Sequence, residues 1–430
     1  MSEASSPCVC VCVFVCVCVC VCVCVCVHQC QLYMRSSHIA SCSSSTIRAS
    51  VTSPQSRQLA APSAPPLASS TDLAVVFFDP VQYVELATAA SPLDRLRLLS
   101  MARCGVDVTL LLVALCTLMP AVTVADLQEG FYKSSTNCSV DVEATVTSVV
   151  QQYVSADRGV GAGLIRLHFH DCFVKGCDAS VLIDPSPVHP DPEKGSPSNG
   201  GLRGLEVIHD AKRRLEGACP GTVSCADILA FAARDAANVL SAGAINYGVP
   251  AGRRDGLASA APDATGRLPP PFARLDRLTE LFAAKGFSQD ELVTLSGAHS
   301  VGRAHCGSFA QRIRPNVSET MDAEYGAGLQ RRCPADGGGD GAAAVDQDQA
   351  TPGDLDNRYY GNVLAGKVLF DSDWALISDG TTRRMVEDNA ADQARWAAKF
   401  IDAMRKMGAL DVLTGDQGEI RRLCNVTNSG

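Results

Sequence analysis

Residues 166–180 have the sequence RLHFHDCFVKGCDAS, and this segment constrains the fold more than any other. In an α-helix, residues three and four apart share a face, so Arg166, Phe169 and His170 point to one side. His168 points about 200° away from His170, so the His-x-His pair does not hold one metal ion. The segment therefore predicts a helix that presents one base beside one cation to a buried ligand.

Cysteine usage divides the chain into two unlike parts. Of its 21 cysteines, 13 precede residue 126 and eight follow it, with no CxxC pair among the eight. An even, scattered set disfavours structural zinc and favours disulfides, which persist in oxidising compartments, so we expect a secreted protein. Eight cysteines allow 105 pairings, and their spacing leaves the choice open. The eight are Cys138, Cys172, Cys177, Cys219, Cys225, Cys306, Cys333 and Cys424.

Glycosylation motifs fit the same compartment. Asn316 and Asn425 begin N-x-Ser/Thr motifs, and Asn137 begins a weaker one because its middle residue is a cysteine. Motifs this short also arise by chance, so they support secretion only together with the cysteines.

The net charge of −9 belongs entirely to residues 126–430, because residues 1–125 carry six basic and six acidic side chains. An acidic region of this kind has no basic stripe for nucleic acid. About 305 residues are enough to bury one large core, or two lobes that share a cleft.

Residues 1–100 form a low-complexity extension. Residues 8–30 alternate Cys and Val, which has the period of a strand and a length that just reaches across a bilayer. We interpret this simple repeat as an artefact of the gene model, because its signal is compositional. Residues 31–70 are rich in Ser, Ala and Pro and are predicted to be disordered.

A secretory signal peptide is predicted at residues 101–125. Residues 101–103 are a short basic start, residues 108–118 (VTLLLVALCTL) are apolar, and residues 123–125 (TVA) supply a small-residue cleavage site. The alternative is a membrane anchor, but the apolar stretch is short for a span. We expect residues 126–430 to form the mature protein, without a membrane segment.

Helical periodicity dominates the mature region, with little strand signal, so we expect a mostly α fold. Rigid or flexible loops are expected at the proline-rich residues 268–271 and the Gly- and Asp-rich residues 335–344. The predicted helices cover residues 140–154, 161–173, 205–216, 223–240, 275–285, 289–295 and 390–407.

A second histidine follows the predicted helix at 289–295. A lone histidine near an apolar face is usually a satisfied core residue, but two observations favour a ligand role for His299. The face of Arg166 and His170 implies a ligand between two helices, and a haem there needs an axial ligand opposite. A later segment, FDSDWALISD, contains Asp373, whose carboxylate can hold the other imidazole nitrogen.

Five motifs together resemble the secretory plant peroxidases, the class III haem peroxidases. They are RLHFHDCFVKGCDAS, CPGTVSCADILAFAARD, GRRDG, TLSGAHSVGRAHC and DNRYYGNV, in that order, and the likeness runs from about residue 131 to 424. The resemblance implies a mostly α, two-lobed haem peroxidase fold over residues 126–430, with haem b between distal and proximal helices.

On the distal side, the resemblance implies that His170, Arg166 and Phe169 face the haem and that Asn199 orients His170. His170 would take a proton from peroxide and return it to the departing oxygen. Arg166 would stabilise the charge that develops as the O–O bond breaks.

On the proximal side, the resemblance implies that His299 is the iron ligand and Asp373 its hydrogen-bonded carboxylate. That hydrogen bond makes the axial imidazole a better electron donor. Pro269 would lie beside the site of the reducing substrate.

The resemblance also implies four disulfides and two Ca²⁺ ions, since a hard cation prefers a cluster of oxygens. Taken singly, the acidic residues involved are equally typical of helix caps and solvated loops. The disulfides would be Cys138–Cys219, Cys172–Cys177, Cys225–Cys424 and Cys306–Cys333. The distal ion would bind Asp171, Asp178, Ser180 and the carbonyls of Val174 and Gly176. The proximal ion would bind Ser300, Asp348, Thr351, Asp356 and the carbonyl of Asp354.

The implied function is that of a secreted, monomeric peroxidase of the apoplast or vacuole. It would reduce hydrogen peroxide, oxidise phenolic donors such as lignin precursors by one-electron steps, and act in the response to oxidative stress. One alternative is a catalytically inactive extracellular haem- or calcium-binding protein of the same fold. Another is a hydrolase, but no GxSxG motif is present. The joint presence of Arg166, His170, Asn199, His299 and Asp373 favours the enzyme.

Overall fold

A computed structural model describes residues 9–15, 19–25, 127–133, 138–333 and 343–429 of the protein. The predictions of a signal peptide at 101–125 and of disorder at 31–70, as well as the motif at Asn137, lie outside these residues. The chain divides into two units, residues 1–106 and residues 107–430, which are described separately.

The described part of the first unit is one antiparallel hairpin. β1 (Val9–Val15) pairs with β2 (Val19–Val25), so that Val9 lies opposite Val25. The alternation of Cys and Val has the period of two that a strand requires. The hairpin therefore follows the sequence repeat, and it contains none of the site residues expected above.

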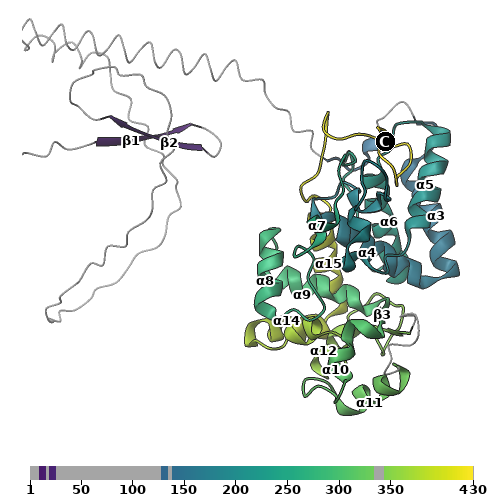
Figure 1. Cartoon of the computed structure of the whole chain (residues 1–430), viewed down its shortest axis with the longest axis vertical. Helices are drawn as coiled ribbons and strands as arrows, with labels where there is room; N and C mark the ends of the chain where they lie inside the picture. The colour runs from purple at the N-terminus through teal and green to yellow at the C-terminus, as the bar shows by residue number, and fades with distance from the viewer. Residues whose placement is uncertain (1–8, 16–18, 26–126, 134–137, 334–342, 430) are drawn as a thin grey trace, which may run out of the picture. The chain divides into compact units, whose positions relative to one another are not determined.

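Helices dominate the second unit, which confirms the mostly α prediction (Figure 1). Among the described residues, no helix combines the length and apolarity needed to cross a bilayer. The helices are α3 (Val142–Ala156), α4 (Arg158–Val174), α5 (Leu205–Ala218), α6 (Cys225–Leu240), α7 (Ala261–Ala264), α8 (Leu275–Ala284), α9 (Gln289–Ser296), α10 (Ala310–Ile313), α11 (Ala323–Arg332), α12 (Arg358–Leu364), α13 (Asp371–Ala375), α14 (Gly380–Ala391) and α15 (Gln393–Met407). A short antiparallel pair joins β3 (Arg303–His305) to β4 (Ala344–Asp346).

Helix α6 is the centre of one group of helices. Its residues from Cys225 to Ala237 are all buried, and most are small or apolar, as expected of a helix surrounded by others. Helices α3, α4 and α5 all pack against it, whereas α9, α12, α14 and α15 contact one another in a second group. Figure 1 shows α3 to α6 in one part of the unit and α8, α9, α12 and α14 in the other. The unit therefore has two lobes. Helix α4, in the first lobe, contains candidate site residues, and helix α9, in the second lobe, leads directly into others.

Side-chain caps fix where several helices begin. The Asp157 carboxylate accepts from the amide of Gly159 at the start of α4, at 2.8 Å. Ser288 and Glu291 form a reciprocal capping box at the start of α9. Each cap satisfies amides that have no partner within the first turn of the helix. The helices that carry the site residues are therefore fixed at their N-terminal ends.

The helix predicted over residues 390–407 is wrong at its start. α14 ends at Ala391, and Asp392 is extended, with φ −138° and ψ 98°. The Asp392 carboxylate accepts from the amide of Arg395 at 3.0 Å, so it caps a new helix, α15. Apolar periodicity continues across this break and conceals it in the sequence.

A buried ion pair ties α6 to a later loop. Arg253 donates to the Asp227 carboxylate at 2.7 Å, and both side chains are almost fully buried. The Tyr132 hydroxyl donates to the other carboxylate oxygen at 2.7 Å. Because removing one partner of such a pair strands a buried charge, the loss typically costs about 3–5 kcal/mol.

The four disulfides are the pairs that the resemblance implies. Cys138–Cys219 joins the segment before α3 to the end of α5, and Cys225–Cys424 joins the start of α6 to the C-terminal segment. Cys172–Cys177 closes the loop that follows α4, while Cys306–Cys333 lies in the separate apolar cluster around α10 and α11. Three of the four disulfides thus lie in the lobe built on α6. One of them, Cys225–Cys424, joins residues 199 positions apart.

Candidate active site

A buried hydrogen-bond relay holds His170 on α4. The His170 Nδ1 atom lies 2.6 Å from the Asn199 amide oxygen, and Asn199 belongs to a 3₁₀ turn, η4 (Pro197–Asn199). The Asn199 amide nitrogen donates to the main-chain carbonyl of Glu193 at 2.7 Å, which fixes the orientation of the amide. An amide oxygen only accepts, so Nδ1 of His170 carries the proton and Nε2 keeps its lone pair. His170 thus presents an unprotonated imidazole nitrogen that can act as a base.

Burial makes His170 neutral. Burial first, and then the positive charge of Arg166, lower the pKa of His170 to about 3, although the hydrogen bond that His170 donates to Asn199 opposes the shift. Arg166 lies one helical turn before His170 and directs its guanidinium toward the carbonyls of Ser198 and Gly200, at 3.3–3.4 Å. Phe169 packs against the His170 ring with centroids 5.7 Å apart. A base and a cation therefore share one helix face, as the sequence predicts.

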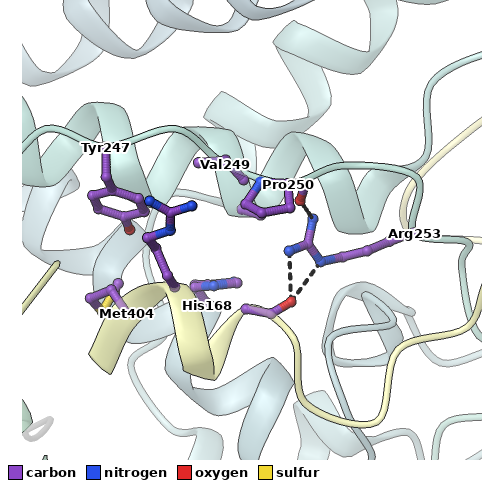
Figure 2. Close-up of a pocket in the computed structure, with 9 residues that line it drawn as sticks. His168, Tyr247, Val249, Pro250, Arg253 and Met404 are labelled. Carbon is purple, nitrogen blue, oxygen red and sulfur yellow. Dashed lines mark hydrogen bonds between the residues drawn. The ribbon is translucent and has the colours of Figure 1, made fainter. Parts of the chain in front are cut away.

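His168 faces the other side of α4. It lines a small pocket with Tyr247, Val249, Arg253 and Met404 (Figure 2). Burial and the charge of Arg253 lower the pKa of His168 to about 3. Its ring also lies 3.6 Å from Cys172, but that sulfur is in a disulfide and offers no thiolate to a metal.

The second histidine has a carboxylate partner. His299 lies in the 3₁₀ turn η5 (Gly297–Ser300), directly after α9. Its Nδ1 atom lies 2.7 Å from Oδ1 of Asp373, which α13 supplies from the other side and which is almost fully buried. Burial lowers the pKa of His299, but the charge and hydrogen bond of Asp373 outweigh burial, so the pKa is raised. With Nδ1 held, the opposite nitrogen, Nε2, is the one available to a metal.

Gly297 allows the turn that carries His299 to lie against α12 and α15. A Cβ atom at this position would come within 2.7 Å of the Tyr360 hydroxyl and 2.8 Å of the Trp396 ring. Both of those side chains are fully buried. A side chain at position 297 would therefore displace His299. This steric constraint explains why the SGAHS motif has a glycine at this position.

The two histidines lie within electrostatic reach of one cation. The charge of Arg166 opposes protonation of His170 and also of His299. The structure therefore brings the α4 face and the α9–η5 turn to one site from positions 129 residues apart in the sequence. One histidine faces this site with its pKa lowered and the other with its pKa raised.

Buried oxygens gather in the loop after α4. Asp171 Oδ2 accepts from the amide of Ala179 at 3.0 Å, whereas Asp171 Oδ1 and Ser180 Oγ are buried without a hydrogen-bond partner. Burial, and then the charge of Asp178, raise the pKa of Asp171 well above its usual value. Burial also raises the pKa of Asp178. A buried carboxylate oxygen and a buried hydroxyl without partners, beside a second carboxylate, form the kind of oxygen cluster that a hard cation binds.

The carbonyls expected at this loop are already hydrogen-bonded. The Val174 carbonyl accepts from Arg267 at 2.7 Å, and the Gly176 carbonyl accepts from the amide of Asp178 at 2.9 Å. A carbonyl oxygen has two lone pairs, so each keeps one for a metal ion. These bonds leave the expected ligand set intact.

Glu193 is a functional candidate that the sequence did not reveal. Both of its carboxylate oxygens are buried without a partner, and burial raises its pKa to about 7. Its main-chain carbonyl is the group that holds Asn199. A lone glutamate six residues before an asparagine has no distinguishing spacing, so nothing local pointed to it.

The proximal oxygen cluster joins η5 to the loop before α12. Asp348 Oδ1 accepts from the amides of Ala350 and Thr351, whereas its Oδ2 is buried without a partner. Burial raises the pKa of Asp356. The remaining expected ligands lie in the same network, in which the Thr351 hydroxyl donates to Asp356 and the amide of Asp356 donates to Ser300.

The Asp354 side chain points away from this cluster. Its carboxylate pairs with Arg158 at 2.8 Å, and both side chains are largely exposed. The sequence expectation concerned only the Asp354 carbonyl, so the side chain is free to serve this surface pair.

The proline-rich loop at residues 268–271 contacts the proximal side. The Pro271 carbonyl accepts from the amide of Ser372 at 3.0 Å, and Ser372 precedes Asp373. Pro269 is partly exposed on this loop, and the next aromatic residue, Phe272, is 64% exposed. The loop thus has an apolar, solvent-facing edge, and it is hydrogen-bonded to α13, the helix whose Asp373 contacts His299.

This helical fold, with two differently held histidines within reach of one cation, is similar to that of the haem peroxidases. Comparison with known proteins agrees: the family model described as peroxidase matches residues 146–392. The chain is 48% identical to Peroxidase 5 of Vitis vinifera over 311 residues, 71% of this chain and 92% of the relative. It is 46% identical to Peroxidase 2 of Zea mays over 303 residues, 70% of this chain and 89% of the relative.

A third relative is the lignin-forming anionic peroxidase of Nicotiana sylvestris, 40% identical over 304 residues, which cover 71% of this chain and 92% of that relative. The chain therefore belongs to the peroxidase family, as a class III plant peroxidase and a haem enzyme.

The lowered pKa of His170 predicts an unusual pH profile. The base must be neutral, and because its pKa falls from 6.5 to about 3, the neutral form is lost only as the pH falls through about 3. Stopped-flow rate constants for the reaction with hydrogen peroxide should therefore stay level between pH about 7 and about 5. A decline with an apparent pKa near the ordinary value of about 6.5 would contradict this assignment.

Proposed function

We propose that this peroxidase reacts with hydrogen peroxide through His170 and Arg166 and holds haem b through His299. The observation that carries the proposal is the pairing of two differently held histidines in one site. His170 is neutral with a free Nε2 lone pair, whereas His299 donates its Nδ1 proton to Asp373. The first suits a base, and the second suits an electron-donating axial ligand.

The donor set fits a haem. Nε2 of His299 accepts no hydrogen bond from the described residues, and 38% of this side chain is exposed, so the nitrogen is accessible to an iron. Phe370 packs edge-on against the His299 ring, with centroids 5.6 Å apart, and limits its rotation. When bound, haem supplies the iron at which the peroxide O–O bond is broken and from which single electrons are exchanged with donors.

Proton transfer is the part that His170 performs. Nε2 of His170 would take the proton from one peroxide oxygen and deliver it to the other, departing oxygen, which leaves as water, while the two electrons for the cleavage would come from the bound haem. Asn199 keeps the imidazole in the tautomer that this exchange needs. Arg166 stabilises the negative charge that develops on the departing oxygen, in a site where burial strengthens the interaction.

Replacing the proposed base tests this division of labour. His170→Ala should slow the reaction with hydrogen peroxide by about 10²-fold or more, because proton transfer is lost. The haem content should not change, since His299 is untouched. His168→Ala is the matched control, because it removes a buried histidine from the opposite face of the same helix. Equal stopped-flow rates for His170→Ala and the unchanged enzyme would contradict the proposal.

Small phenols, lignin precursors among them, are the donors that we propose. Three observations support this class: the partly exposed Pro269, the exposed ring of Phe272 and the name of the relative, a lignin-forming peroxidase. An apolar, solvent-facing edge suits an aromatic donor that gives up one electron and leaves. Failure of the purified enzyme to oxidise any simple phenol with peroxide would exclude this donor class.

We further propose that two Ca²⁺ ions hold the site in shape. Support comes from buried oxygens of Asp171, Ser180 and Asp348 that have no hydrogen-bond partner. Buried polar atoms normally have a partner, and a bound ion would supply one. Asp171 directly follows His170, so an ion bound there also fixes the distal helix end. An ion present at a hundredfold its dissociation constant stabilises the fold by about 2.7 kcal/mol.

Metal removal tests the calcium proposal. Prolonged chelation should lower both thermal stability and activity, and Ca²⁺ should restore them far better than Mg²⁺, which demands tighter octahedral sites. Asp348→Asn should lower the bound calcium by one ion, while Asp354→Asn should leave it unchanged, since that side chain faces Arg158. An active enzyme that contains no calcium on metal analysis would exclude the proposal.

We propose that residues 126–430 are the working enzyme and that residues 101–125 are a secretory signal. The protein would then be a secreted monomer of the apoplast or vacuole that acts in hydrogen peroxide catabolism and oxidative stress. The support is the four-disulfide framework, which the additional cysteines of the 8–30 repeat would scramble by exchange.

The natural N-terminus decides this division of the chain. Sequencing of the protein from plant tissue should begin within a few residues of Asp126. Recovery of peptides that span residues 8–30 would instead show that the extension is part of the working protein.

A further inference from the structure

Tyr359 is a third partner in the proximal hydrogen-bond system. It is the second residue of α12, its side chain is 1% exposed, and its ring meets that of His299 edge-on with centroids 6.2 Å apart. Its hydroxyl donates to Oδ1 of Asp373 at 2.7 Å. A tyrosine hydroxyl placed here therefore contacts the carboxylate that orients His299.

Tyr359 and His299 donate to the same oxygen atom. Nδ1 of His299 also lies 2.7 Å from Oδ1 of Asp373. A carboxylate oxygen can accept both bonds, but each donor withdraws charge from the lone pairs that the other uses. A phenol is a far weaker acid than a carboxylic acid, so Tyr359 keeps the proton that it donates.

We propose that Tyr359 is a positioning residue that limits how strongly Asp373 draws the Nδ1 proton from His299. The inference rests on the proposed role of His299 as the iron ligand. A phenol that shares Oδ1 leaves less negative charge for His299, so the imidazole keeps more of its proton and donates less to the metal. Tyr359 thereby moderates the increase in electron donation that the hydrogen bond to Asp373 gives to His299.

The neighbouring tyrosine separates this role from packing. Tyr360 is also buried, at 0% exposure, but its hydroxyl donates to the carbonyls of Val293 and Thr294 at 2.8 and 3.0 Å. Within the described residues, the Tyr360 hydroxyl makes no hydrogen bond to Asp373. Tyr359→Phe and Tyr360→Phe therefore remove the same atom from two adjacent buried rings, and only the first change alters the donors at Asp373.

The experiment uses the holoenzyme with its natural haem. Resonance Raman spectroscopy of the ferrous protein gives the iron–histidine stretching frequency, and a redox titration gives the iron reduction potential. Tyr359→Phe should raise the stretching frequency and lower the potential, because Asp373 then draws on His299 alone. Tyr360→Phe should match the unchanged enzyme in both. No shift in Tyr359→Phe, or a shift in the opposite direction, would overturn the inference.

A second variant keeps the test decisive if Tyr359→Phe does not fold. Replacement of Tyr359 by a ring-fluorinated tyrosine preserves the ring and hydroxyl but makes the phenol a stronger donor. The stretching frequency should then fall below that of the unchanged enzyme and the potential should rise. An unchanged or higher frequency, or an unchanged or lower potential, would refute the competition for Oδ1.

One control distinguishes this inference from the proposed function. The iron–histidine band should disappear in His299→Gly. A band that survives that change would overturn the axial role of His299, and the inference with it. A band that disappears in His299→Gly but does not move in Tyr359→Phe would overturn the inference alone.

Discussion

Burial of an imidazole, with or without a countercharge, is the physical constraint on which this site depends. His170 is buried beside a cation, and its hydrogen-bond partner, the amide of Asn199, is neutral. Its pKa therefore falls to about 3. His299 is held by the carboxylate of Asp373, so its pKa rises. Two histidines in one site thus have pKa values shifted in opposite directions. The lowered pKa suits a base, and the carboxylate-held imidazole suits an electron-donating ligand.

The distal side depends on a sequence of contacts that begins in a loop. Cys172–Cys177 closes the segment between Asp171 and Asp178 and so holds these two carboxylates close together. Asp171 is covalently next to His170, and the Glu193 carbonyl holds Asn199. The proposed calcium ion would therefore act on catalysis through position, since it fixes the loop that orients the base. The proximal side has a similar order, from Tyr359 to Asp373 to His299.

Local patterns in the sequence predicted local geometry well. The face of Arg166 and His170, and the exclusion of His168 from it, follow from the 100° advance per residue and hold in α4. Asp373 was proposed from chemistry and resemblance, because its bond to His299 spans 74 residues. Glu193 and Tyr359 were missed, since burial without a partner and a shared oxygen atom are properties of tertiary packing. The break at Asp392 was missed because apolar spacing continues across it.

The absorption spectrum of the purified protein, before and after one equivalent of hydrogen peroxide, tests the central claim most directly. A histidine-held haem beside a neutral base should give a Soret band that shifts within the mixing time of a stopped-flow instrument. Reaction should remain fast at mildly acidic pH, because His170 stays neutral there. A protein purified from its natural source without a Soret band, or with a band that peroxide does not change, would contradict the account.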